Sequence, residues 1–299
     1  MERDAGRPEE GKSLLAFLGA RLRRHRLEKG WSQGKLASLA HTTGAMISYM
    51  ENAQRVPSAD LAHDLDQLFD TDFFAEFLPF VLRYAYPSWF LPFIELERQA
   101  RRHRVFEAQI IPGLLQTEDY ARAMLAPVRL DNVDDVVAAR LSRQVLFDRP
   151  EPPHTWFILD EQALRRHIGG PEVMAMQLER LLTAGQDPRV VIQVVPDEVP
   201  AHPGLAGAFT LLTLDQGKES TGDGLARSSN KSVEGVSRKA VKRPPHDVLY
   251  VDGFFQGRTA VDPEEVSAAS LSYDLLTSYA LPPEASAGRI REHLKGLKR

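Results

Sequence analysis

Cysteine is absent from this sequence of 299 residues. A disulfide framework and a cysteine-ligated zinc site are therefore excluded, and such a chain suits a reducing compartment. Long apolar runs are also absent, because none approaches the roughly 18 residues that a membrane-spanning helix needs. The polar start MERDAGRPEEGKS lacks the apolar core of a secretory signal. We therefore expect a cytoplasmic protein that does not contact a membrane.

The residues that are present have an ordinary globular composition, 43% hydrophobic and 26% charged, and the length favours two domains. The net charge of −4 is unevenly distributed. Residues 12–57 carry eight Lys/Arg against two acids and are +6, whereas the first eleven residues are −2 and the remainder is −8. A basic end on an acidic body is expected when one domain meets the phosphates of a nucleic acid and the other does not.

Four short helices are predicted near the N-terminus, over residues 14–28, 33–40, 44–52 and 59–69. Ser32 and Thr43 are placed to cap the second and third of these helices. Leu36 and Ala37 on the second helix and Ile47 on the third supply small and apolar side chains where the two helices would cross. This pair of helices, joined by a short turn, predicts a helix-turn-helix.

The third helix has an outward face for the major groove of double-stranded DNA, made of Gly44, Ala45, Ser48 and Tyr49. Positive charge for the phosphates is expected from Arg21, Arg23, Arg24, Arg26, Lys35 and Arg55. Glu51 is interpreted as a helix cap or the partner of an arginine, not as a DNA contact. A four-helix bundle without a DNA role is the alternative, and the local positive charge disfavours it.

The same segment contains a specific pattern of residues: Trp31-Ser32-Gln33, Leu36-Ala37, Ile47-Ser48, Glu51, Arg55 and Pro57-Ser58. In this pattern it resembles the lambda-repressor-like, XRE-type helix-turn-helix family. The resemblance implies that the DNA bases are faced by Gln33, Thr43, Ala45, Ser48 and Tyr49. Ala53 departs from the pattern, since the family usually has glycine there.

The rest of the chain alternates predicted helices and strands. Helices are expected over residues 94–104, 117–126, 132–147, 161–168, 171–184 and 262–280. Strands are expected over residues 155–159, 189–195, 207–214 and 247–252. The predicted fold class is therefore mostly α with a small sheet (α+β), in which a helical helix-turn-helix domain precedes an α+β effector domain. The aromatic run over 73–93 is interpreted as core in preference to a ligand box.

Two stretches of the larger domain have a distinctive composition, IPGLLQTEDYAR over 111–122 and DEQAL over 160–164. Further residues extend the pattern: Arg140, Arg143-Gln144, Met174, Gln177-Leu178, Val195-Pro196, Gly204, Gly207 and Phe209. Together they resemble the actinobacterial XRE-type regulators with a C-terminal domain of unknown function, the WhiJ-like regulators, over roughly residues 14–285. The resemblance implies a developmental or antibiotic-related regulator whose signal is a small partner protein or a small molecule.

Candidate ligand- or partner-binding residues in the larger domain are Arg140, Arg143, Gln144 and Glu161. The two arginines lie one helical turn apart and could clamp a carboxylate or phosphate. A salt-bridged or solvated helix face is the favoured alternative for them.

Enzyme signatures are missing from the larger domain. No His-x-x-x-His pair, no Gly-x-Ser-x-Gly elbow and no glycine-rich phosphate loop occurs. The candidate catalytic groups that remain are scattered along the sequence: His154, Asp160, Glu161, His167, His202 and Asp252. We expect no enzyme activity, no cofactor and no metal, and a DNA-tethered enzyme is the least favoured alternative.

The expected organisation consists of a disordered tail (1–12), a DNA-binding domain (13–70), an aromatic connector (71–94), an effector domain (95–285) with a flexible insertion (216–246), and a C-terminal tail (286–299). The function expected is sequence-specific regulation of transcription at the nucleoid. A homodimer is expected because one recognition helix reads too few base pairs for useful specificity. The alternative is a DNA-recruited, antitoxin-like interaction protein that docks a small partner.

Overall fold

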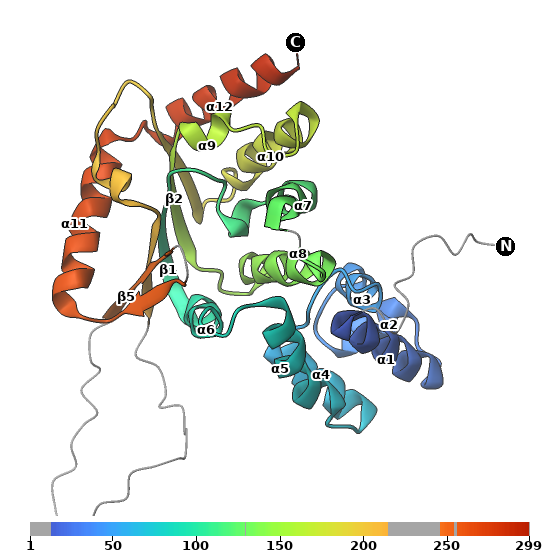
Figure 1. Ribbon diagram of the computed structural model, residues 1–299. Coiled ribbons are helices and arrows are strands. Elements are labelled where there is room, and N and C mark those ends of the chain that lie inside the picture. Colours follow the sequence, from blue (N-terminus) through green and yellow to red (C-terminus); the bar gives the residue numbers. More distant parts are fainter. Residues whose placement is uncertain (1–12, 129, 215–245, 254–255, 299) are drawn as a thin grey trace, which may run out of the picture.

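The computed structural model describes residues 13–128, 130–214, 246–253 and 256–298. Five helices form the N-terminal part, which lies at the lower right of Figure 1 beside a larger part built on a six-stranded sheet. These helices are α1 (Leu14–Glu28), α2 (Gln33–Leu39), α3 (Gly44–Glu51), α4 (Ala59–Phe69) and α5 (Phe73–Ala85). The α+β class and the four helices predicted up to residue 69 are confirmed.

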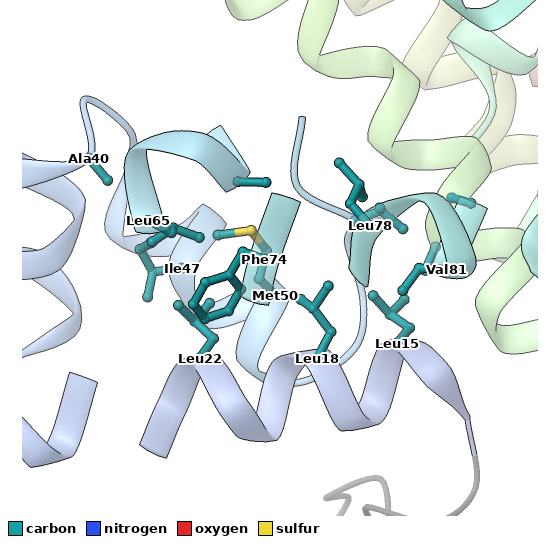
Figure 2. Close-up of a cluster of buried hydrophobic side chains, with 14 of the residues drawn as sticks. Leu15, Leu18, Leu22, Ala40, Ile47, Met50, Leu65, Phe74, Leu78 and Val81 are labelled. Atoms are coloured by element: carbon teal, nitrogen blue, oxygen red, sulfur yellow. The ribbon is translucent and has the colours of Figure 1, made fainter. Parts of the chain in front are cut away.

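The N-terminal core consists of apolar side chains from all five helices. Figure 2 shows α1 contributing Leu15, Leu18 and Leu22 to this core, where they meet Met50 and Phe74. All five of these side chains have 0% exposure. Burying each of them fully contributes about 1.5–3 kcal/mol, so the helices depend on their shared core more than on their own propensity.

The sheet of the larger part has the strand order β3-β2-β1-β4-β5-β6. Its strands are β1 (Ala100–Glu107), β2 (His154–Asp160), β3 (Val190–Val195), β4 (Phe209–Leu214), β5 (His246–Val251) and β6 (Arg258–Ala260). The first three are mutually parallel, and the other three are antiparallel to their neighbours. The strands on either side of the expected insertion, β4 and β5, pair with each other, with Phe209 opposite Val251 and Leu214 opposite His246.

Helices cover both faces of the sheet, as Figure 1 shows for α11 on one side and α7, α8 and α10 on the other. The bounds of these and the remaining helices are α6 (Leu91–Gln99), α7 (Glu118–Leu125), α8 (Val133–Ser142), α9 (Gln162–Arg165), α10 (Pro171–Ala184), α11 (Pro263–Tyr279) and α12 (Pro283–Leu297). Phe106 and Ile158 pack with Tyr273 of α11, whereas Phe157 packs on the opposite face with Leu178 of α10.

The two parts are joined by packing as well as by the chain. Ala138 and Ala139 of α8 belong to the core of the N-terminal helices. The N–H of Val56 donates to Oγ of Ser142 at 2.7 Å, and the amide of Asn132 donates to the carbonyl of Tyr84 at 2.6 Å. The N-terminal helices therefore rest directly on α8.

Several sequence expectations differ from the structure. The helix predicted over 94–104 is wrong after residue 99, where β1 begins. The predicted helix over 132–147 ends at residue 142 and continues as tight 3-10 turns. Residues 73–85, expected in a connector, form α5, and most of the expected C-terminal tail belongs to α12. The expected N-terminal tail 1–12 lies outside the described residues, as does the expected insertion 216–246 except for its last residue, His246, which begins β5.

In the described part of the chain, no helix combines the length and apolar character needed to cross a membrane.

Candidate nucleic-acid interface and interdomain cavity

Local capping sets the start of both helices in the helix-turn-helix. Oγ of Ser32 accepts from the N–H of Lys35, and Oγ1 of Thr43 accepts from the N–H of Met46, each at 3.1 Å. Gly19 lets α3 approach α1 closely, because a Cβ at this position would lie 2.4 Å from the carbonyl oxygen of Met50. The orientation of α3 is therefore fixed by its cap and by contact with α1.

A buried ion pair also joins α1 to α3. Arg26 donates to both carboxylate oxygens of Glu51, and its Nη1 donates to the carbonyl of Trp31 at 2.8 Å. The hydrogen bonds that Arg26 donates to Glu51 raise the pKa of this arginine. Nε2 of Gln33 donates to Oε2 of the same carboxylate at 2.8 Å. The arginine partner expected for Glu51 is confirmed, whereas the phosphate contact expected of Arg26 is wrong because its side chain is buried and occupied.

The outward face of α3 lies at the protein surface. Ala45 and Tyr49 are exposed, the latter by 43%, and Gly44 and Ser48 are half-buried. Nδ2 of Asn52 donates to the carbonyl of Ser48 at 2.9 Å, so the last turn of the helix has its own cap. The four residues expected to form the outward face of this helix therefore share one accessible side, and three of them, Ala45, Ser48 and Tyr49, are among those expected to face the bases.

The cations expected to contact phosphate differ in how accessible their side chains are. Lys35 is exposed, Arg23 is half-buried, and Arg24 donates to Glu28 at 2.8 Å on the surface. The guanidinium of Arg55 lies 5.1 Å from the ring centre of Tyr49, and burial lowers the pKa of this arginine. Surface ion pairs such as that of Arg24 are weak, so a phosphate can replace the carboxylate.

The candidate residues of the larger domain fall into two places. Arg140, Arg143 and Gln144 lie together on α8 and the turn that follows it. Nη1 of Arg140 donates to Oε1 of Gln116 at 3.2 Å, and Nε2 of Gln144 donates to the carbonyl of the same Gln116 at 2.7 Å. Arg143 forms a two-fold hydrogen-bonded pair with Glu97, at 2.7 and 2.8 Å.

Glu161 lies apart from this cluster, at the end of β2. Its carboxylate is 1% exposed and accepts from Arg289 at 2.9 Å and His293 at 2.7 Å, both on α12. The backbone N–H of Asp197 donates to it at 3.1 Å. Burial opposes the charge of Glu161, but these hydrogen bonds outweigh it and lower the pKa of the carboxyl. These contacts fasten α12 to the sheet.

A cavity of about 630 Å³ opens where the N-terminal helices meet the larger part. Arg140 and Arg143 line it together with the end of α5, the start of α6 and the ends of β1 and β5. The aromatic residues between 73 and 93 occupy two environments. Phe74 is fully buried in the N-terminal core, as expected, whereas the cavity is lined by Tyr86, Trp89, Phe90 and Phe93.

Sequence reasoning missed Glu107 as a residue of this cavity and considered Asp252 only as a catalytic group. Alternation over His103, Val105 and Glu107 would have placed these three residues on one face of a strand. That observation requires β1 to be recognised as a strand, and a helix was expected there. Among the described residues, no group of His, Cys, Asp and Glu could hold a metal ion.

Two family models match the chain. One is described as a domain of unknown function (DUF5753) and matches residues 90–292, and the other is described as a helix-turn-helix domain and matches residues 18–73. No curated protein and no solved structure matches. The N-terminal part is thus a helix-turn-helix domain, which suggests DNA binding and regulation of transcription.

Proposed function

The chain belongs to the family defined by the domain of unknown function DUF5753, and from its helix-turn-helix domain we propose that it is a sequence-specific, DNA-binding regulator of transcription. The observation that carries this proposal is the exposed face of α3 with Ala45, Ser48 and Tyr49. A buried ion pair holds that helix in place, Arg55 lies against Tyr49 on it, and we propose that Arg23, Arg24 and Lys35 of the same domain contact the phosphates of the bound DNA. Side chains from a rigid helix contact base edges, while cations around it contact phosphates.

We propose that Gln33 and Thr43 contribute at the edge of this interface. Gln33 keeps its amide oxygen for a DNA donor while its nitrogen is held by Glu51. Thr43 lies exposed at the N-terminus of α3, where the helix dipole favours a phosphate. In this proposal the two roles are distinct, because the glutamine contacts a base and the threonine contacts the backbone of the DNA.

The active form in this proposal is a homodimer that reads a two-fold site. An exposed aromatic strip on α1 and α5 offers a self-complementary surface close to the DNA-binding helices. Phe77 stacks on Phe73 at 5.2 Å and lies 6.2 Å from Phe80, and Phe17 of α1 lies 5.5 Å from Phe77. Phe80 is 57% exposed and Phe17 is 39% exposed. Contiguous exposed aromatic groups are typical of protein interaction surfaces.

The larger domain is proposed to control DNA binding in response to a small ligand or a small partner protein, as in the WhiJ-like XRE regulators of actinobacteria. Its α8 packs on α5 and touches the loop after α3, so a change in the larger domain reaches the DNA-binding helices directly. Partner docking is the second candidate, since Leu271 and Leu275 on the outer face of α11 are 62% and 42% exposed. The proposed location is the cytoplasm, at the nucleoid.

The proposal is tested by selecting genomic DNA fragments that bind the full chain and measuring affinity for the selected site. The double variant Ser48→Ala and Tyr49→Ala removes side chains from the outward face only. We expect it to lose about 1–3 kcal/mol for each base pair that these side chains read, while affinity for random DNA stays nearly constant. Selection of no sequence by the wild-type chain would contradict the proposal, and unchanged affinity of the variant would reject α3 as the recognition helix.

A further inference from the structure

The interdomain cavity has the size and lining of a site for a small organic molecule. Its volume of about 630 Å³ lies within the range of about 300–1,000 Å³ that is usual for such sites. Much of its wall is apolar, from side chains that include Trp89, Phe90, Phe93, Val105, Leu114 and Phe157. A ligand that fills the cavity therefore has an apolar body, and the polar groups of the wall decide which head group that body carries.

The total charge of the wall selects no ligand, because positive and negative side chains are equal in number. They are Arg83, Arg140 and Arg143 against Glu97, Glu107 and Asp252. Arg83 and Asp252 are both exposed, so water screens the charge of each. The preference of the cavity is therefore decided by which of its inner polar groups already have partners.

Arg143 is committed to contacts within the protein. Two of its nitrogens donate to the carboxylate of Glu97 at 2.7 and 2.8 Å. Its guanidinium also lies 5.2 Å from the ring centre of Phe90 and 5.8 Å from that of Phe93. A clamp made of both arginines, which the sequence suggested, is therefore disfavoured, and Arg140 is the arginine that remains for a ligand.

Arg140 lacks a partner of opposite charge. Within the described ranges, none of its nitrogens is paired with a carboxylate, and the oxygen that accepts from it belongs to the neutral side chain of Gln116, 3.2 Å from Nη1. Its Nε is buried without a hydrogen-bond partner, and its Nη2 donates to no described residue. Burial, and then the charge of Arg143, lower the pKa of Arg140. Buried charges are normally paired, so this guanidinium indicates an anionic acceptor that completes it.

Tyr86 supplies a second donor without an acceptor. It lies in the same wall, is 8% exposed, and its hydroxyl has no hydrogen-bond partner in the described part of the chain. The charges of Arg143 and Arg140 act on this hydroxyl, so both guanidinium groups lie near it. Arginine side chains only donate hydrogen bonds, so neither can accept the proton of the tyrosine. Burial raises the pKa of Tyr86 to about 12, and the hydroxyl therefore keeps that proton for an acceptor.

Glu107 does not oppose an anion in this cavity. It is half-buried, and burial, followed by the nearby charge of Asp252, raises its pKa to about 8. Its carboxyl therefore carries a proton at neutral pH. In that form it neither neutralises Arg140 nor repels a negatively charged ligand.

We propose that this cavity binds an organic acid with an apolar body, whose carboxylate accepts hydrogen bonds from Arg140 and Tyr86 while the body contacts the aromatic wall. A carboxylate offers two oxygens, and hydrogen bonds to an ionised acceptor are roughly twice as strong as neutral ones. The inference rests on the proposed function, because it names the ligand class that the larger domain would sense. Tyr86 directly follows α5 and belongs to the N-terminal core, so an acid on its hydroxyl contacts the DNA-binding part itself.

The test is calorimetric titration of the full chain at pH 7, without DNA and in a buffer free of carboxylates. Indole-3-propionate is compared with indole-3-propionamide and tryptamine, and naphthalene-1-acetate with naphthalene-1-acetamide. The amides keep the shape of the acids without their charge. We expect at least one acid to bind, and its uncharged or cationic analogues to bind at least about tenfold more weakly. Binding of neither acid, or binding of an amide or of tryptamine as tightly as the acid, overturns the proposal.

Two variants assign the binding to this cavity. Tyr86→Phe removes only the hydroxyl and should weaken acid binding by about tenfold, and Arg140→Gln should weaken it by at least that factor. The hydroxyl has no partner in the protein itself, so Tyr86→Phe should not lower the melting temperature measured without ligand. Tyr279→Phe on α11 and Arg291→Gln on α12, both at exposed positions, are the matched controls and should change neither quantity.

Several outcomes of the variant measurements contradict the proposal. These are full affinity for the acid in either cavity variant, an equal loss in the controls, and a marked fall in the melting temperature of Tyr86→Phe, which would mean that the hydroxyl already has a partner. Because the titrations contain no DNA, their failure leaves DNA binding by α3 intact, and failure of DNA selection leaves acid binding intact.

Discussion

Arg26 of α1 and Glu51 of α3 form a two-fold ion pair, with Nη2 of the arginine 2.9 Å from Oε2 of the glutamate. Both side chains are almost completely buried, at 9% and 3% exposure. The same carboxylate holds Gln33, so one buried pair aligns both helices of the helix-turn-helix. Replacing one partner of a buried pair leaves the other charge without compensation.

Glu51→Ala is therefore expected to lower the free energy of unfolding by about 3–5 kcal/mol and to weaken DNA binding as well. Urea denaturation followed by circular dichroism measures the first effect. Glu28→Gln is the matched control, because it removes a glutamate paired with exposed Arg24, and it should change stability by less than about 1 kcal/mol. A stability loss of similar size in both variants would show that the buried ion pair stabilises the fold no more than the surface pair of Glu28 does.

DNA affinity should depend strongly on salt, with a log–log slope of about −0.9 for each phosphate contacted. Changing Arg23 and Arg24 together to Gln should make that slope shallower by up to about two phosphate contacts without altering base preference. Arg291→Gln, at an exposed position of α12, is the control and should leave the slope unchanged. If the double variant kept the salt slope of the wild-type chain, these two arginines would not be phosphate contacts.

Glu28→Gln gives a complementary result in the same assay. It removes one carboxylate that competes with a DNA phosphate for Arg24, so DNA affinity at low salt should rise modestly. A decrease would mean that the pair itself positions the arginine for DNA.

The aromatic strip is expected to hold the dimer. Phe80→Arg introduces charge at an exposed position, so the monomer should fold while the fraction of dimer in analytical ultracentrifugation falls. Leu271→Arg makes the same change on α11, on the other side of the molecule, and should leave the dimer intact. Dissociation by Leu271→Arg alone would instead place the dimer contact on α11, and a wild-type chain that is monomeric at all concentrations would refute the dimer.

Acid should weaken the attachment of α12 through Glu161. Its pKa is lowered in the folded chain, so its contribution to stability is present above its unfolded pKa of about 4.3 and is lost as the pH falls through the folded value. Glu161→Gln should cost about 1–3 kcal/mol at pH 7 and almost nothing once the wild-type carboxyl is protonated. Denaturation curves at pH 7 and pH 3 measure this difference, which must shrink on acidification for the assignment to stand.

The helix-turn-helix could be predicted from the sequence because the residues that determine it lie close together in the chain. Ser32 and Thr43 cap the helices that follow them, and apolar side chains recur at helical spacing. The start of α5 could not be predicted in this way. Its cap is Asp66 of the preceding helix, which accepts from the N–H groups of Phe74 and Ala75 at 2.9 and 2.7 Å.

The missed central strand has a similar explanation. The sequence LERQARRHRVFE contains no glycine or proline between α6 and β1, so it reads as a continuous helix. Pairing with β2 and β4 decides its conformation, and Arg104 on this strand donates to Asp247, 143 residues away, at 2.6 Å. The cavity could not be predicted without this strand, because Glu107, which lines the cavity, is the last residue of β1.

The order of the strands has a consequence for synthesis on the ribosome. The N-terminal core takes nearly all of its members from residues 15–86, so it can close soon after they emerge. β1 must instead wait for β4, whose first residue follows Glu107 by about 100 positions, which takes roughly 5–20 s at usual translation rates. The part of the chain that meets DNA is therefore complete on the nascent polypeptide while the domain proposed to govern it is still being made.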